Sequence, residues 1–355
     1  MNTSHITEND SIAFISQVIQ AAGLNTGDSQ LWAKLLTETS LMGFDTHGIR
    51  MVERYINVIT QGGVTLEKPE VITVNDSGSN ATVLIDAHSC LGHLAAWKAM
   101  ETAGEYAKKH GISYVGVRNS GHIGALSLYS RALAQRDCIG ICSTSSLTGI
   151  APTGGIKPTV GINPLSVAAP LEDDNFFLLD ISTTVTAMGK VTLAMDNGKT
   201  IPPGWALDKN GKPTTDPKEA RVGSLLPIGG YKGYGLAMAI ELLCSALTGG
   251  SFAGDIKSWV LHPDSKAAIP FSIIAIDIGH FQNPADFRKR IKDWMGYVTD
   301  VPKQEGVDKI YYPGEIENDT YRRRRKEGIP LEDVTVESFR RLAEKYSLSE
   351  PPIQG

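Results

Sequence analysis

The spacing of apolar positions predicts a chain that alternates between helices and short strands. Apolar side chains recur at three- and four-residue intervals over residues 8–24 and 28–43, as in amphipathic helices. Asp28 is placed to cap the second of these helices. A third helix is predicted over residues 47–60, where it ends at a pair of glycines. The same spacing predicts further helices over residues 95–110, 123–136, 231–247, 284–296 and 336–346.

Short apolar runs between these helices predict strands. The predicted strands cover residues 71–74, 81–86, 112–117, 139–143 and 273–278, with a turn at residues 75–78. The segment 149–211 differs, because it is rich in glycine, proline and threonine and has only short apolar runs, such as residues 176–179. This segment predicts loops and strands packed together. Helices interleaved with strands indicate an α/β fold.

Composition indicates an ordinary globular protein. The 355 residues are 41% hydrophobic and 21% charged, enough for a large core that we expect to divide into two or three lobes. The net charge of −5 argues against nucleic acid as a partner, and no apolar run is long enough to cross a membrane. The first residues lack the basic and apolar segments of a signal peptide, so a cytoplasmic location is expected.

The cysteines form no metal-binding pattern in the sequence. The four cysteines include no C-x-x-C pair and are expected to be reduced thiols that fill small core positions. His88, Cys90 and His93 lie close together, but their spacing matches no common zinc site. The sequence therefore predicts no bound metal.

Two histidines lie beside hydroxyl and glycine residues at predicted helix boundaries. His47 follows Thr46, and His122 follows Ser120 and Gly121. An imidazole titrates near neutral pH, so it can give or take a proton during a reaction. Glycines around a histidine let backbone or ligand approach it closely. We therefore regard both histidines as candidate acid–base groups, with Thr46 and Ser120 as their hydrogen-bonding neighbours.

Two arginines follow the first histidine on its predicted helix. Arg50 and Arg54 lie three and seven residues after His47, on one predicted helix face. Guanidinium groups on that face would hold a substrate carboxylate while the histidine moves a proton. The alternative is a capping histidine followed by surface arginines, and the local pattern does not choose between the two.

Two further cationic features are candidate anion sites. Lys232 lies among four glycines just before a predicted helix, which suits a phosphate, although a flexible turn with a solvated lysine fits the same pattern. Residues 322–326 form a run of four arginines and a lysine, interpreted as a solvated helix face. The alternatives for this run are an anionic cofactor or a subunit contact. No G-x-G-x-x-G follows a strand, which argues against a Rossmann fold.

Several motifs together resemble the type-2 malate/L-lactate dehydrogenase family. This family includes ureidoglycolate dehydrogenase, sulfolactate dehydrogenase, diketogulonate reductase and a cyclic-imine reductase. The resemblance covers the chain from Gly23 to about Ala343, and the order and spacing of the motifs are more specific than any one of them. The motifs are Thr46-His47-Gly48, Asn119-Ser120-Gly121-His122, Pro152-Thr153-Gly154-Gly155, Gly161-Ile162-Asn163-Pro164, Asp180-Ile181-Ser182-Thr183-Thr184, Met188-Gly189-Lys190, Tyr231-Lys232-Gly233-Tyr234-Gly235 and Tyr311-Tyr312-Pro313-Gly314-Glu315.

The resemblance implies a non-Rossmann α/β fold with a helical lobe and a mixed-sheet cofactor-binding lobe. We expect residues 1–75 with 300–355 to form the helical lobe, which carries His47 and the C-terminal helix. Residues 76–140 with 225–299 would form a central α/β lobe, and residues 141–224 the cofactor-binding lobe. The resemblance also implies an intertwined homodimer, with higher assembly as a further option, and a nicotinamide cofactor, NAD or NADP, held between lobes.

Site residues carry over from the family by matching position. His122 matches the catalytic histidine of ureidoglycolate dehydrogenase, and His47 matches that of diketogulonate reductase. The matching cofactor contacts are Ser146, Asp180, Ile181, Ser182, Lys232, Gly314 and Glu315. The implied reaction is hydride transfer between NAD(P)H and a small 2-oxo or 2-hydroxy acid such as malate or lactate. Alternatives are ureidoglycolate or sulfolactate oxidation, cyclic-imine reduction, or a cofactor-binding protein without activity.

Two positions depart from the family pattern. Many members have an arginine four residues after the first histidine, where this chain has Met51 and places Arg50 one residue earlier. Leu147 stands where ureidoglycolate dehydrogenases that use NAD carry an acidic residue able to hold the ribose hydroxyl. The first departure leaves the substrate open, and the second leaves the choice between NAD and NADP open.

Overall fold

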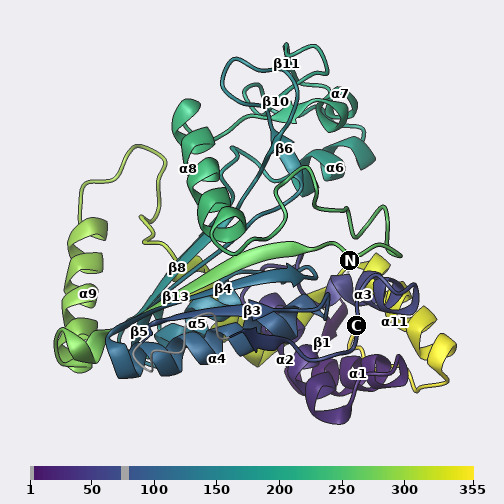
Figure 1. Cartoon of the computed structure of the whole chain (residues 1–355), viewed down its shortest axis with the longest axis horizontal. Helices are drawn as coiled ribbons and strands as arrows, with labels where there is room; N and C mark the ends of the chain where they lie inside the picture. The colour runs from purple at the N-terminus through teal and green to yellow at the C-terminus, as the bar shows by residue number, and fades with distance from the viewer. Residues whose placement is uncertain (1–3, 73–79) are drawn as a thin grey trace.

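The computed structural model describes residues 4–72 and 80–355 and is built around one seven-stranded sheet (Figure 1). The strand order is β2-β3-β4-β13-β5-β8-β9, in which β3 and β4 pair in parallel and the other described neighbours pair antiparallel. This mixed sheet confirms the predicted non-Rossmann α/β fold. The strands are β2 (Glu70–Ile72), β3 (Thr82–Asp86), β4 (Ile112–Ser120), β5 (Cys138–Thr144), β8 (Leu165–Pro170), β9 (Phe176–Ile181) and β13 (Ile269–Asp277).

The strands predicted from the sequence correspond to strands of this sheet wherever the structure describes them. Residues 81–86, 112–117, 139–143 and 273–278 correspond to β3, β4, β5 and β13. Part of the strand predicted at 71–74 and the whole turn predicted at 75–78 lie outside the described residues. β8 and β9 belong to the segment expected to form the cofactor-binding lobe, but they hydrogen-bond into the central sheet beside β5. The lobe boundaries themselves stay a prediction.

Helices cover both faces of the sheet. On one face lie α4 (Gly92–His110) and α5 (Ser127–Ala134), and α4 packs through a row of small buried alanines that lets it approach the strands closely. The other face carries α8 (Tyr231–Glu241) and the π-helical turn Leu242–Ala246, as the region 231–247 was predicted to be helical. The helix predicted at 123–136 begins only at Ser127, because Gly124 has a φ of +73° and breaks the helix.

A second core lies among the terminal segments. Helices α1 (Glu8–Ala21), α2 (Thr26–Leu41), α3 (Val52–Thr60) and α11 (Asp333–Tyr346) pack with the two-stranded sheet of β1 (Ser4–Ile6) and β14 (Ile329–Leu331). The prediction that Asp28 caps α2 was wrong, because the side chain of Asn25 accepts the backbone N–H of Asp28. The third predicted helix was also wrong over its first turn. His47 lies in a turn, followed by a 3-10 turn at Ile49–Met51 before α3 begins.

A smaller five-stranded sheet forms the upper part of the molecule in Figure 1. Its strands are β6 (Thr148–Ile150), β7 (Val160–Gly161), β10 (Ala206–Leu207), β11 (Pro213–Thr214) and β12 (Ser224–Leu225). Two helices, α6 (Met188–Asp196) and α7 (Pro217–Val222), pack beside it. The prediction of loops and strands over 149–211 therefore missed α6, whose buried side is small and centres on Val191.

Two further helices lie between β13 and β14 in the sequence. The helix α9 (Pro284–Thr299) matches the prediction at 284–296, and α10 (Glu315–Glu327) contains the run of arginines. The prediction that this run is a solvated face was wrong for Arg324, whose side chain is only 11% exposed. No helix in residues 4–72 and 80–355 is long and apolar enough to cross a membrane.

Candidate active site

The two candidate histidines lie side by side, although 75 positions separate them in the sequence. The rings of His47 and His122 stack with centroids 5.8 Å apart and an angle of 25° between their planes. His47 comes from the turn after α2, and His122 lies two residues beyond the end of β4, an inner strand of the sheet. The structure therefore brings together the two residues that local pattern singled out independently.

The segment that carries His122 packs closely against the start of α4. A Cβ on Gly121 would lie 2.9 Å from the carbonyl oxygen of Cys90, and one on Gly124 would lie 2.5 Å from Nε2 of His93. Because side chains at these two positions would collide with their neighbours, glycine is needed on both sides of His122. The glycines that flagged this motif in the sequence thus have a steric role.

Aromatic rings and two hydrogen bonds fix the orientation of His122. Its ring stacks on Trp259 at 4.7 Å and lies 6.0 Å from the ring of Tyr55. The Tyr55 hydroxyl is 2.7 Å from Nδ1, and the backbone N–H of Gly124 donates to the same nitrogen at 3.3 Å. When Nδ1 accepts from these two groups the neutral ring carries its proton on Nε2, and when Nδ1 donates to the Tyr55 hydroxyl Nε2 can accept a proton. No hydrogen bond among the described residues reaches Nε2, which is left for proton transfer.

Burial keeps this cluster of histidines uncharged near neutral pH. Packing lowers the pKa of His122 well below its ordinary value, and the nearby His47 and His93 lower it further. Burial also lowers the pKa of His47. His93 is fully buried against Tyr55 and Trp32, and its pKa falls to about 3, mainly through burial. The neutral imidazole is the form that a general base requires, although the lowered pKa makes it a weaker base than an exposed histidine.

The hydroxyl neighbours differ in what they contact. The Thr46 hydroxyl lies 2.9 Å from Nδ1 of His47, so it orients that ring. Ser120 is fully buried, and its hydroxyl donates to the carbonyl oxygen of Gly121. A cavity of about 10 Å³ beside Tyr55 and His122 has room for about one water molecule.

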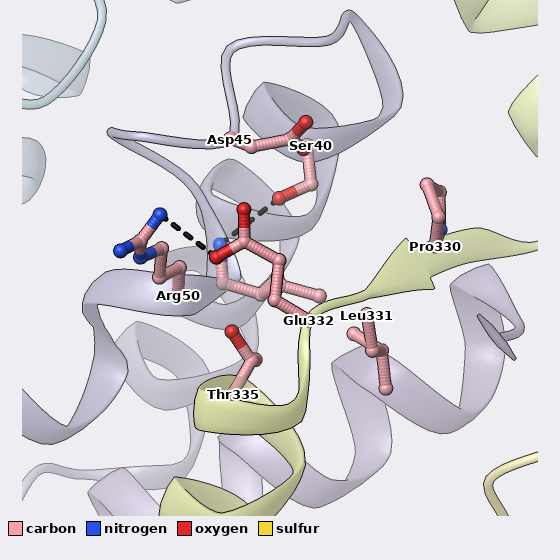
Figure 2. Close-up of a pocket in the computed structure, with 8 residues that line it drawn as sticks. Ser40, Asp45, Arg50, Pro330, Leu331, Glu332 and Thr335 are labelled. Atoms are coloured by element: carbon pink, nitrogen blue, oxygen red, sulfur yellow. Dashed lines mark hydrogen bonds and ion pairs between the residues drawn. The ribbon is translucent and has the colours of Figure 1, made fainter. Parts of the chain in front are cut away.

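The predicted arginines do not share a helix face with His47. That expectation was wrong because His47 precedes the helix. Arg50 forms an ion pair with Glu332 at 2.9 Å across a pocket of about 300 Å³, as Figure 2 shows. Asp45 also lines this pocket, so its ionisable side chains carry a net negative charge. Arg54 is exposed on α3.

Hydrogen bonds link the segment of Ser146 and the segment next to Ser182, two predicted cofactor contacts, to the segment of residues 162 and 163. The backbone N–H of Ser146 donates to the side chain of Asn163 at 3.0 Å, and Asn163 in turn donates to Glu241 at 2.6 Å. Thr183, next to Ser182, donates through its backbone to Ile162. These bonds hold the strand ends near residues 146 and 182 against α8. Sequence reasoning gave Asn163 no role of its own, although it lies in a quoted motif.

Lys232 lies where it was predicted, at the first turn of α8. Gly229 and Gly230, just before it, both have positive φ, at +59° and +65°. The residue before them, Ile228, donates its backbone N–H to the carbonyl oxygen of Thr183 at 2.9 Å. The lysine is exposed and forms no ion pair within residues 4–72 and 80–355. This free cation at a helix start fits the phosphates of a nucleotide.

The remaining predicted contacts meet along β9. Gly314, with a φ of +94°, caps α10 and lies so close to β9 that a Cβ there would be 2.6 Å from the backbone nitrogen of Leu178. Glu315 follows it and pairs with Lys309 at 2.7 Å. Asp180 and Ile181 end the same strand. The two motifs therefore converge on one edge of the central sheet.

Asp180 also connects this edge to the segment of His122. Its carboxylate accepts the backbone N–H of Ser127, the first residue of α5, at 2.8 Å. Burial raises the pKa of Asp180 to about 6, against the opposing effect of the Ser127 hydrogen bonds. A carboxylate at a helix N-terminus satisfies a free N–H and interacts favourably with the helix dipole. Asp180 thus anchors the loop between His122 and α5.

Two aromatic residues of the site had no signal in the sequence. Tyr55 lies on α3 and Trp259 in the loop before β13, and their rings stack at 5.1 Å in nearly parallel planes. A tyrosine on an apolar helix face and a tryptophan in a loop are ordinary core residues by pattern.

Among the described residues no group of three His, Cys, Asp or Glu side chains is arranged to hold a metal. All four cysteines are free and buried, as predicted.

Comparison with known proteins identifies what this arrangement resembles. The sequence profile of the malate/L-lactate dehydrogenase family matches residues 6–340. The chain is 32% identical over 349 residues to the malate/(S)-sulfolactate dehydrogenase of Methanothermus fervidus, covering 97% of this chain and 98% of that protein. It is 34% identical to the NAD⁺-dependent ureidoglycolate dehydrogenase of Escherichia coli K12 over 88% of each chain. The crystal structure of malate dehydrogenase from Entamoeba histolytica superposes with a TM-score of 0.92, at 31% identity, over 99% of this chain and 100% of that one.

Proposed function

The chain belongs to the malate/L-lactate dehydrogenase family, and we propose that it transfers a hydride between NAD or NADP and a small 2-hydroxy acid or its 2-oxo form. The observation that carries this proposal is the pair of stacked histidines. Tyr55 and Gly124 occupy Nδ1 of His122 and leave Nε2 for the substrate oxygen. A nicotinamide supplies the hydride chemistry when bound, and the protein orients the reactants and moves the proton.

The proton steps follow from the state of the two rings. In the oxidative direction the neutral ring carries its proton on Nδ1, which donates to the Tyr55 hydroxyl, and Nε2 accepts the proton of the substrate hydroxyl as the hydride leaves the substrate carbon. In the reductive direction the protonated ring returns this proton to the carbonyl oxygen. A bound carboxylate would raise the lowered pKa values of both rings, because a nearby negative charge favours the imidazolium. His122 is our candidate for the proton transfer, because Tyr55 and Trp259 fix the orientation of its ring. His47 stacks on it as a supporting neighbour.

Three features of the chain support binding of a dinucleotide. Lys232 offers a free cation at the start of α8, and the hydroxyls of Ser146 and Ser182 lie on linked strand ends. The exposed Leu147, beside Ser146, neither holds a ribose hydroxyl nor repels a 2′-phosphate. The Leu147→Asp variant should therefore lose activity with NADP and keep it with NAD, as steady-state kinetics with both cofactors would show.

The apolar surface of α8 supports the homodimer. Tyr231, Met238, Leu242 and Leu247 are 44–68% exposed on this helix and the π-helical turn that follows it. Exposed apolar surface of this kind marks a contact with another chain, and a second copy of the same chain is the commonest such partner. Light scattering should give twice the mass of the chain, and Leu242→Glu should shift it toward the monomer. A wild-type monomer at micromolar concentration would contradict the dimer.

The activity is tested by following the absorbance of the reduced nicotinamide. Purified protein is mixed with NADH or NADPH and a panel that contains oxaloacetate, pyruvate, sulfopyruvate and a cyclic imine carboxylate. Oxidation is assayed separately with malate, lactate, sulfolactate and ureidoglycolate. We expect turnover with a 2-oxo or 2-hydroxy acid that the His122→Ala variant lacks. Turnover of the cyclic imine alone, or of nothing in the panel, would contradict the proposal.

A further inference from the structure

One arginine of the basic run points into the protein. Along α10, the side chains of Arg322 and Arg325 are 55% and 57% exposed, whereas that of Arg324 is 11% exposed. Its guanidinium donates through both terminal nitrogens to the Asp45 carboxylate, at 2.5 Å and 3.0 Å. This two-point contact fixes the carboxylate in orientation as well as in distance.

The same guanidinium also holds the end of α2. One of its terminal nitrogens donates to the carbonyl oxygen of Ser40, in the last turn of that helix. The Ser40 hydroxyl in turn accepts the backbone N–H of Ile49 at 3.0 Å. Arg324 therefore contacts Ser40 before the turn and Asp45 within it, and Ser40 in turn holds Ile49 after it.

This turn is the segment that carries His47. The backbone N–H of His47 donates to Phe44 at 2.9 Å, and that of Gly48 donates to Asp45 at 3.4 Å. Asp45 is thus part of the turn, and its carboxylate is the group that Arg324 binds. A change in the position of Asp45 would move the backbone two residues before His47 and, with it, the stacking of His47 on His122.

The helix that supplies Arg324 begins at predicted cofactor contacts. Gly314 caps α10 and lies against β9, and Glu315 is its first residue. Arg324 lies nine positions after Glu315, about 14 Å along the helix. One helix therefore runs from the predicted cofactor contacts to the turn of His47.

We propose that Arg324 is a positioning residue for His47. By holding Asp45, it fixes the turn that keeps the His47 ring stacked on His122. The proposal rests on the proposed function, since it concerns the geometry of proton transfer. Loss of the guanidinium leaves the Asp45 carboxylate without its two-point contact and lets the turn move. Misplacement of a reacting group by about 1 Å can cost about 10²-fold in rate.

The test compares Arg324→Ala with Arg323→Ala, its exposed neighbour on the same helix. Arg324→Ala should lower kcat by about 10²-fold, with little change in cofactor affinity measured by direct titration. Arg323→Ala should behave as wild type. Arg324→Lys should recover only part of kcat, because an ammonium cannot form the two-point contact. Wild-type kcat in Arg324→Ala would overturn the proposal.

A double-mutant cycle separates positioning from a general structural effect. If Arg324 acts through His47, Arg324→Ala should cost much less in a His47→Ala background than in the wild type. An equal cost in both backgrounds would overturn the proposal. If Arg324→Ala does not fold, the cycle is run with Arg324→Lys and with Asp45→Asn, and the same two outcomes decide it. A wild-type protein without activity toward any hydroxy acid would contradict the proposed function, which is a distinct result.

Discussion

The hydroxyl of Tyr55 lies 2.7 Å from Nδ1 of His122, so a buried tyrosine on α3 and a histidine after β4 form one hydrogen-bonded pair. The rings are also stacked, 6.0 Å apart, and Tyr55 is only 3% exposed. This contact holds the imidazole with its other nitrogen free. The contact also gives the buried Tyr55 hydroxyl a hydrogen-bond partner. This phenol stays protonated, because burial raises the pKa of Tyr55 far above its ordinary range.

Tyr55→Phe tests the importance of that contact. Phenylalanine keeps the stacking on His122 and Trp259 but removes the hydroxyl, so the imidazole loses one of its two fixed partners. We expect kcat to fall by about tenfold, the value of one hydrogen bond of about 1.4 kcal/mol in the transition state. Unfolding temperature serves as the control. An unchanged kcat would mean that Gly124 alone orients the ring.

Replacing each histidine in turn identifies the proton-transfer group. His122→Ala should lower kcat by about 10²- to 10⁴-fold, because general acid–base catalysis is lost. His47→Ala should have a smaller effect than His122→Ala if His47 mainly supports its neighbour, but one at least as large as that of Arg324→Ala. Cofactor affinity, measured by fluorescence titration, should be similar in both variants. The reverse order of the two effects would assign the proton to His47.

The pH profile should reflect the lowered pKa of His122. Oxidation of a hydroxy acid requires the neutral ring, so kcat/KM falls as pH drops through the pKa of the free enzyme. Because burial places that pKa below the ordinary histidine value, activity should persist into mildly acidic solution. The measurement is kcat/KM for oxidation from pH 5 to 9. A loss of activity already above neutral pH would contradict this assignment, and His122→Ala should lose the acidic limb.

Lys232→Ala should weaken cofactor binding. The lysine is exposed, forms no ion pair among the described residues and lies at the start of α8, where a phosphate would be favoured. KM for the nicotinamide cofactor should rise several-fold more than KM for the acid. Lys190, exposed on α6, provides a matched lysine-to-alanine comparison. Equal cofactor affinity in the Lys232 variant and wild type, by direct titration, would show that it is only a turn residue.

Arg50 remains the candidate to hold the substrate carboxylate, with Glu332 as its competitor. Their ion pair is largely exposed, at 39% and 63% of the two side chains, so a substrate would displace Glu332 at a cost of about 1 kcal/mol or less. Arg50→Ala should raise KM for the acid, and Glu332→Gln should lower it. Arg54→Ala is the comparison on α3. If only Arg54→Ala impairs binding, the clamp is Arg54, and if neither does, the substrate is held by another part of the protein.

The sequence by itself determined most of the secondary structure and the family. Helices α1, α4 and α9 follow from apolar spacing, because burying one side of a helix imposes a period of 3.6 residues on the chain. The motifs around His47 and His122 were recognisable because glycine and hydroxyl residues beside a histidine are visible locally. Their joint order specified a fold that the structural comparison confirms.

Only the tertiary structure decided which of these residues meet. Local pattern cannot place Trp259 on His122, since the two lie on separate segments joined only through the sheet and its loops. It also treated Arg324 as one of several surface arginines. The helix turns each successive residue by about 100°, so neighbouring arginines face different surroundings, and only the packing of α10 against the turn after α2 buries Arg324 on Asp45.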